Sequence, residues 1–186
     1  MVLKDVDLNE LERRLNVLSC IAHDLILKSK EWWLRHSFFR GKVSKDVLDG
    51  ICTRNAIEFP IIDISNVREV LSRYGINVYS SQFTSSYANV EERSIYLRRC
   101  DVFEILHECT HILFHDMLSS VSTMDGECIV DAITLIAYVK GARLAYPEKT
   151  FIACVKRRLR PKLNFFLTMI KCSEWKKVLL KYWLKA

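Results

Sequence analysis

The N-terminal part of the chain has the apolar spacing of an amphipathic helix. Asp7, with a glutamate three residues later, is typical of a capping box at a helix start. Apolar residues then recur at helical spacing: Leu8, Leu11, Leu15, Leu18, Ile21 and Leu25. We expect this helix to run to about Ser29 or on through Trp33. A loop around Gly41 and a short helix over residues 44–52 are expected after it.

A different pattern follows Pro60. A short helix is expected first, capped by Asp63 or Ser65. Gly75 should end this region, because glycine readily takes the left-handed conformation. The segment INVYSS then alternates apolar and polar residues, as a half-buried strand does.

A second strand is expected at SIYLRR, residues 94–99, antiparallel to the first strand or near it. Residues 83–92 between the two predicted strands are rich in serine and acidic residues and predict a turn or loop. An extended peptide could add to the sheet edge near residues 94–98 by strand addition.

The rest of the chain predicts helices. One should cover residues 101–118, and another should begin near Gly126 after a loop over 119–126. Pro147 should break the pattern, and Pro161 should divide the helical remainder in two. This order predicts an α+β fold with a small antiparallel sheet. We expect a helical segment over 1–57, a core over 58–146, and C-terminal helices over 147–186 that pack on the same domain.

Charge is distributed unevenly along these 186 residues, whose net charge is +6. Residues 140–186 hold 13 basic and 2 acidic side chains, a net of +11, and residues 1–139 hold 15 and 20, a net of −5. The basic segment is a candidate surface for nucleic acid, an acidic protein or an anionic membrane. The alternatives are a solvated helix face and, for Trp175, Leu179 and Trp183, packing on the body of the protein.

Targeting and cysteine patterns favour a cytoplasmic protein. The start of the chain lacks the apolar stretch of a signal peptide, and no apolar run approaches the ~20 residues of a transmembrane helix. The chain has seven cysteines, an odd number, and no two of them form a CxxC motif. This pattern predicts free, mostly buried thiols in a reducing compartment.

The predicted helix over 101–118 contains the sequence HECTH. His107 and His111 are four residues apart, so a helix places both imidazoles on one face, where they can bind one tetrahedral Zn²⁺. Glu108, next to the first histidine, would act as general base and then general acid without binding the metal. The alternative is an ordinary amphipathic helix that contains two histidines.

A zinc hydrolase also needs a third protein ligand and one open coordination position. We expect Glu127 to be that ligand, and Asp131, four residues later, to accept a hydrogen bond from His107 or His111. The alternative for Glu127 is a carboxylate that merely favours a helix N-terminus. His115 lies one turn beyond His111 and is expected to be structural or to support a ligand, without binding the metal itself. Cys109 is expected to be a small core residue, and Asp116 is expected to point away from the metal.

These segments together resemble the ImmA/IrrE family of zincin-like metallopeptidases. The similarity covers about residues 58–140 and rests on FPIIDISNVREVLSRYGINVY, SIYL, FEILHECTHILFH and GECIVDAITLIAYV. Two features depart from the family pattern. Thr110 stands where a glycine is usual, and the following helix has Glu127, Cys128, Ile129, Val130 and Asp131 where the family often reads Glu-x-Glu-Ala-Asn. The basic C-terminal segment lies outside the similarity.

The resemblance implies a minimal zincin core and a zinc-dependent endopeptidase with one Zn²⁺ per chain. It assigns His107, His111 and Glu127 to the metal and Glu108 to catalysis. It also implies a substrate inside the cell, such as a DNA-binding repressor. The competing hypothesis is a non-catalytic regulatory protein on the same scaffold, which binds nucleic acid or an acidic partner through residues 149–186.

Overall fold

The computed structural model of the protein describes residues 7–29 and 59–186. These ranges contain six helices and three short strands, which confirms the predicted α+β class with helices at both ends. The loop expected around Gly41 and the helix expected over 44–52 lie outside the described residues. Within the described ranges, no helix combines the length and apolar character needed to cross a membrane.

The first helix, α1 (Leu8–Lys28), begins where the sequence predicts. The Asp7 carboxylate caps it by accepting hydrogen bonds from the backbone amides of Asn9 at 2.9 Å and Glu10 at 3.4 Å. The next described helix is α4 (Ile64–Ser72), which follows Asp63. Gly75 then turns the chain with a φ of +66°, the left-handed conformation expected of it.

The sheet consists of β1 (Asn77–Ser80), β2 (Tyr87–Asn89) and β3 (Ser94–Leu97), in the order β1-β3-β2. Two predictions about it are wrong. The sheet is mixed, because β1 and β3 are parallel and only β2 runs antiparallel to β3. The segment 83–92 also contains a strand, since the chain after β1 reverses within it and places β2 on the far side of β3.

The site helices are α5 (Val102–Leu118) and α6 (Thr123–Ala145). The Asp101 carboxylate caps α5 by accepting from the Glu104 amide at 2.9 Å. The start of α6 lies three residues before the expected start at Gly126, because the Ser122 hydroxyl caps it by accepting from the Asp125 amide at 3.3 Å. Gly126 therefore lies inside the helix.

Two further helices complete the chain, α7 (Lys149–Met169) and α8 (Ser173–Lys185). Pro147 lies between α6 and α7, as predicted. The predicted division at Pro161 is wrong, because α7 continues through it. A proline there leaves the carbonyl of Arg157 without its helical donor. Both residues are exposed, so water can satisfy that carbonyl.

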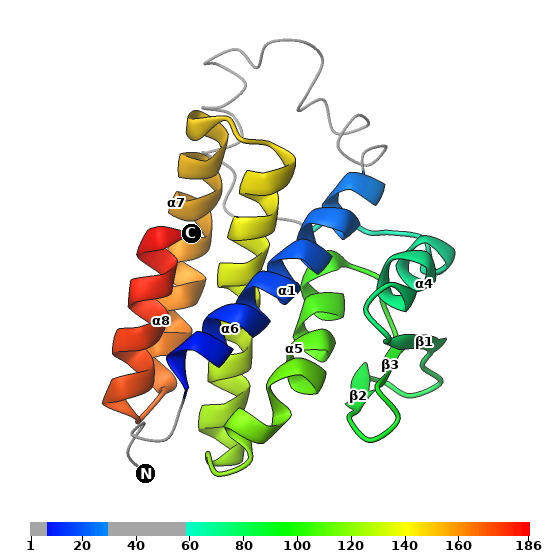
Figure 1. Cartoon of the computed structure of the whole chain (residues 1–186), viewed down its shortest axis with the longest axis horizontal. Helices are drawn as coiled ribbons and strands as arrows, with labels where there is room; N and C mark the ends of the chain where they lie inside the picture. Colours follow the sequence, from blue (N-terminus) through cyan, green and yellow to red (C-terminus); the bar gives the residue numbers. More distant parts are fainter. Residues whose placement is uncertain (1–6, 30–58) are drawn as a thin grey trace.

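Helix α6 lies at the centre of the molecule (Figure 1). Helix α1 crosses it, α5 lies beside it, and α7 and α8 cover its other side, while the sheet and α4 lie beyond α5. A single hydrophobic core extends from α1 to α8. Trp175, Leu179 and Trp183 are at most 5% exposed within this core, so they pack on the body and do not form a membrane-surface face.

The cysteines differ in part from the expectation. Five of them carry free thiols: Cys20, Cys100, Cys109, Cys128 and Cys172. Of these five only Cys109 is buried. The prediction of free thiols is therefore confirmed for these five, and the prediction that they are mostly buried is wrong.

Candidate metal centre

Helices α5 and α6 bring the three predicted ligands together. His107 and His111 lie one turn apart on α5, and their Nε2 atoms are 3.1 Å from each other. The Oε2 atom of Glu127, on α6, is 3.4 Å from the Nε2 atom of His107 and 3.5 Å from that of His111. These three side chains form the one group of potential metal ligands found among the described residues.

The separations match those around a tetrahedral zinc ion. Ligand atoms about 2.0–2.1 Å from a tetrahedral Zn²⁺ are about 3.3 Å apart, and the observed separations are 3.1, 3.4 and 3.5 Å. Two imidazole nitrogens and one carboxylate oxygen are also ordinary zinc donors. The residues therefore fit a zinc ion that keeps one position for water or substrate.

Asp131 fixes the orientation of one of these histidines. Its Oδ1 atom lies 2.9 Å from the Nδ1 atom of His107, which accordingly donates to it. This contact directs the Nε2 atom of His107 toward His111 and Glu127. The expected hydrogen bond between Asp131 and one of the two histidines is thus present, and it is of the kind that orients metal-binding histidines in proteins.

Thr110, which departs from the family pattern, is accommodated by a hydrogen bond between the two helices. Its hydroxyl donates to the Leu106 carbonyl at 2.7 Å, so it accepts from the Thr134 hydroxyl at 3.1 Å. Both threonines are fully buried. This contact joins α5 to α6 within the same turn of α5 that carries the two histidines. Cys109 is likewise fully buried in the core, as expected, and burial raises the pKa of its thiol.

The electrostatics of the group favour a cation. Burial lowers the pKa of His107, but hydrogen bonds to Asp131 and Glu127 outweigh burial and raise it to about 10. Burial and the neighbouring His107 lower the pKa of His111. The hydrogen bond from His107 lowers the pKa of Glu127. Two carboxylates thus surround one imidazole, and a divalent cation would take the place of the proton that His107 otherwise holds.

Glu108 lies next to His107 on α5 and is only 6% exposed. Burial raises its pKa to about 7, although the positive charge of His107 opposes the shift. A carboxyl group with this pKa can accept and release a proton near neutral pH. Its place beside the ligands and its environment suit a general base and acid.

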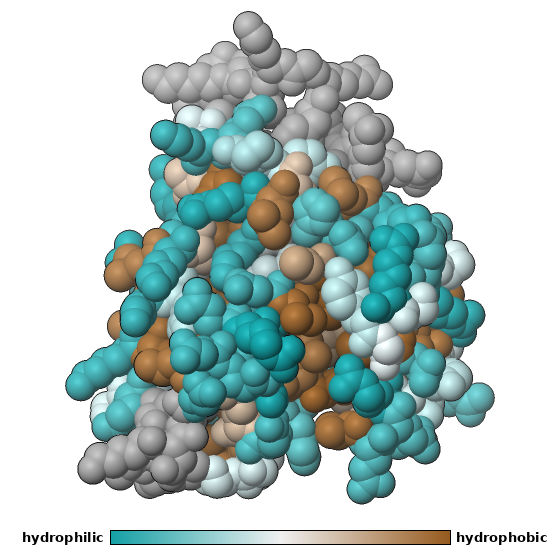
Figure 2. Space-filling view, in the orientation of Figure 1, coloured by the Kyte–Doolittle hydropathy of each residue, from teal (hydrophilic) through white to brown (hydrophobic). Residues whose placement is uncertain are grey.

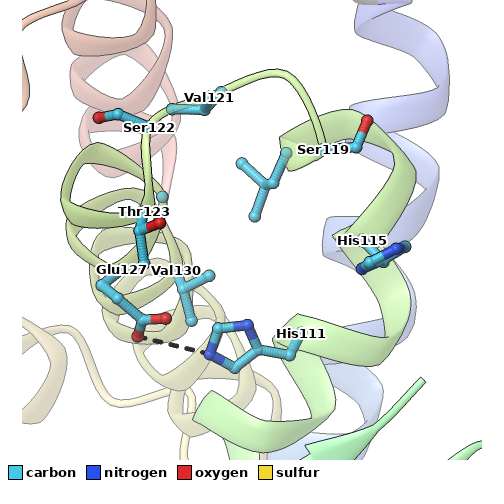
Figure 3. Close-up of a pocket in the computed structure, with 10 residues that line it drawn as sticks. His111, His115, Ser119, Val121, Ser122, Thr123, Glu127 and Val130 are labelled. Carbon is cyan, nitrogen blue, oxygen red and sulfur yellow. Dashed lines mark ion pairs between the residues drawn. The ribbon is translucent and has the colours of Figure 1, made fainter.

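A cavity that the sequence does not predict opens beside the centre. Its volume is about 210 Å³, and His111 and Glu127 form part of its wall. Figure 3 shows the two side chains facing each other at one end, with the end of α5 and the start of α6 on opposite sides. The first turn of α6 contributes Thr123, which the sequence places in a loop. No periodic signal marks these wall residues, because the cavity arises only where the two helices meet.

Two other predicted residues lie outside the ligand group. His115 is exposed and lines the cavity one turn beyond His111. Asp116 binds Arg14 of α1, with one contact of 2.9 Å from Nη2 to Oδ2. Both results agree with the expectation that neither residue is a metal ligand. The partner of Asp116 could not be found from the sequence, since the two residues are far apart along the chain.

The predicted edge for a substrate strand is wrong. Strand β3 holds residues 94–97 at the centre of the sheet, so its backbone already pairs on both sides. The edges are β1 and β2, and β2 contacts α5. Sequence reasoning missed this because it treated β2 as a loop.

Comparison with known proteins gives no relative: no family model, no curated protein and no solved structure matches this chain. The functional interpretation therefore rests on the residues and their geometry.

Proposed function

We propose that the protein is a zinc-dependent endopeptidase that cleaves a protein partner inside the cell, such as a DNA-binding repressor. The observation that carries the proposal is the set of three donor atoms 3.1–3.5 Å apart on α5 and α6, with Glu108 beside it. The spacing of His107, Glu108 and His111 in the sequence HECTH is the pattern of zinc peptidases that use a glutamate beside two histidines.

A zinc ion bound by His107, His111 and Glu127 would polarise the scissile carbonyl and activate a water molecule for attack. Glu108 takes a proton from the attacking water and later delivers it to the leaving amine. Asp131 holds the His107 ring in position through Nδ1. The buried hydrogen bond between Thr110 and Thr134 maintains the spacing of the two helices.

The substrate has a possible docking edge in β2 (Tyr87–Asn89). This strand lies at the edge of the sheet and contacts α5, the helix that carries the histidines. An extended peptide that pairs with β2 would form backbone hydrogen bonds there, as in other cases of strand addition. We propose this edge in place of the central strand β3.

Glu108→Gln tests the catalytic role. We expect the variant to keep its zinc, because Glu108 is not a ligand, and to lose peptide cleavage by about 100-fold or more. The measurement is the rate at which new peptide termini appear when the zinc-loaded protein is incubated with a peptide library, followed by mass spectrometry. Glu148→Gln, at the exposed residue that precedes α7, is the control and should keep the wild-type rate. Equal cleavage by the wild type and Glu108→Gln would contradict the role.

A second candidate function is nucleic-acid binding by α7 and α8. Their exposed basic residues include Lys149, Arg157, Arg160, Lys177 and Lys181. Within the described part of the chain, none of these five side chains has an ion-pair partner. Figure 2 shows hydrophilic residues over much of this side of the molecule, with apolar ones between them. Unpaired cations on adjacent helices suit a phosphate backbone.

Fluorescence anisotropy with duplex DNA at several salt concentrations tests this second function. Binding that weakens with salt and is lost in the double variant Lys177→Glu, Lys181→Glu would support it. Arg73→Glu, which reverses an exposed charge just after α4, is the control and should keep the binding. No binding by the wild type at low salt would contradict it.

A further inference from the structure

The cavity of about 210 Å³ shares two wall residues with the metal centre. His111 and Glu127 form one end of it, and the rest lies between the C-terminal turns of α5, the following loop and the first turns of α6 (Figure 3). A substrate whose scissile bond lies at the metal centre therefore has a neighbouring side chain within reach of this cavity.

Most of the side chains that line the cavity are uncharged. Three apolar side chains line the cavity, Leu118, Val121 and Val130, and Val130 is fully buried. Small hydroxyl side chains and a glycine form most of the remainder: Ser119, Ser122, Thr123 and Gly126. The imidazole of His115, which is exposed to solvent, completes the wall together with His111 and Glu127. The wall contains no lysine, arginine or aspartate, and its one carboxylate belongs to the ligand Glu127.

A charged side chain would find no free partner of opposite charge at depth, and burying an unpaired charge is costly. The cavity, at about 210 Å³, is also large enough for an aliphatic side chain, since an apolar cavity of about 150 Å³ accommodates benzene. We propose that the cavity is a specificity pocket, which receives an uncharged aliphatic side chain of about leucine size next to the scissile bond. This inference rests on the proposed zinc centre.

A pair of hydroxamates tests the pocket without any need for the natural substrate. Hydroxamates bind zinc directly, so N-acetyl-leucine hydroxamate and N-acetylglycine hydroxamate differ only in the side chain offered to the cavity. Calorimetry on the zinc-loaded protein measures the two dissociation constants. We expect the leucine compound to bind about tenfold or more tightly, because its apolar side chain leaves water.

Thr123→Trp and Met124→Trp form a matched pair in the first turn of α6. Both residues are exposed, so both variants should fold, but only Thr123 lines the cavity. Thr123→Trp should fill the cavity and remove the preference for leucine, while the affinity for the glycine compound and the zinc content stay unchanged. Met124→Trp should keep the preference.

The outcomes separate the pocket from the zinc centre. Equal binding of the two hydroxamates by a zinc-loaded protein would overturn the pocket and leave the zinc centre standing. A preference for leucine that persists in Thr123→Trp would also overturn it. Failure to bind zinc would overturn both proposals. A leucine preference lost only in Thr123→Trp would support the pocket.

Discussion

Helix α6 has two interfaces of opposite character. Where α1 crosses it, the backbones nearly touch: a Cβ atom at Gly141 would lie 2.5 Å from the Cβ atom of Ala22 and 2.8 Å from the His23 nitrogen. Where α5 lies beside it, polar groups meet instead, with Asp131 on His107 and Thr134 on Thr110. One helix thus combines tight apolar packing with a polar, ligand-bearing contact.

The difference separates stability from chemistry. Close packing at Gly141 leaves no room for an added atom, so the free energy of unfolding should be sensitive to size there. At the α5–α6 contact, the polar groups satisfy one another and hold donor atoms in place, so metal affinity should be sensitive to chemistry there. Substitutions at the two interfaces should therefore change different measured quantities.

Gly141→Val should have the largest effect of the substitutions considered. The new side chain would clash with the backbone of α1, and backbone atoms cannot move aside as the end of a flexible side chain can. We therefore expect a loss of about 3 kcal/mol in the free energy of unfolding. Urea unfolding of the metal-free protein measures it. Gly126→Ala is the control on the same helix, because nothing lies within 4 Å of the added Cβ. It should stabilise the protein by up to about 1 kcal/mol. If Gly141→Val left the free energy of unfolding unchanged, the close contact between α1 and α6 would be refuted.

Asp131→Asn should affect the other interface. We expect zinc affinity to fall about 10–100-fold, because the variant no longer holds His107 with a charged acceptor. Competition with a zinc chelator measures this affinity. Asp24→Asn is the matched control, since Asp24 also lies 2.9 Å from the Nδ1 atom of a histidine, His23, but on α1. Unchanged affinity in Asp131→Asn would show that Asp131 does not support the site.

The contact between Arg14 and Asp116, which joins α1 to α5, should have the smallest effect. Its hydrogen bonds to Arg14 lower the pKa of Asp116. Because the pKa of this carboxyl group is lower in the folded state, ionised Asp116 stabilises the fold at pH values above the pKa of an unfolded aspartate, about 3.9. This stabilisation is lost as the pH falls through the lower pKa of the folded state. Asp116 is 67% exposed, so the contribution should stay below about 1 kcal/mol.

Urea unfolding of the wild type and Asp116→Asn at several pH values measures this contribution. We expect the wild type to be slightly more stable at pH values near neutrality, and the difference to shrink progressively below about pH 4. A difference that grows as the pH falls would contradict the assignment.

Local signals in the sequence predict most of the helices and the grouping of the candidate ligands. Asp7 caps its helix as expected, and helical spacing alone places His107 and His111 on one face. Glu127 and Asp131 share a face of α6 for the same reason. These features depend on residues within one or two turns of each other, so a single sequence is enough to find them.

Features that depend on distant residues were missed. The parallel pairing of β1 with β3 requires the chain to run back between them as β2, on the far side of β3, and β2 is only three residues long. Pro161 looks like a helix break, but its exposed position in α7 makes the missing hydrogen bond tolerable. The cavity beside His111 is lined by the end of α5, the loop after it and the start of α6, so no single local pattern predicts it.

The most direct test of the central claim is the zinc content of the purified protein. Mass spectrometry of the wild type, supplied with zinc and kept from chelators, should find about one zinc ion per chain. The same measurement on Glu127→Ala should find a large loss, because two histidines alone bind zinc weakly. A wild-type protein that holds no zinc under these conditions would contradict the account, and α7 and α8 would become the place to look for function.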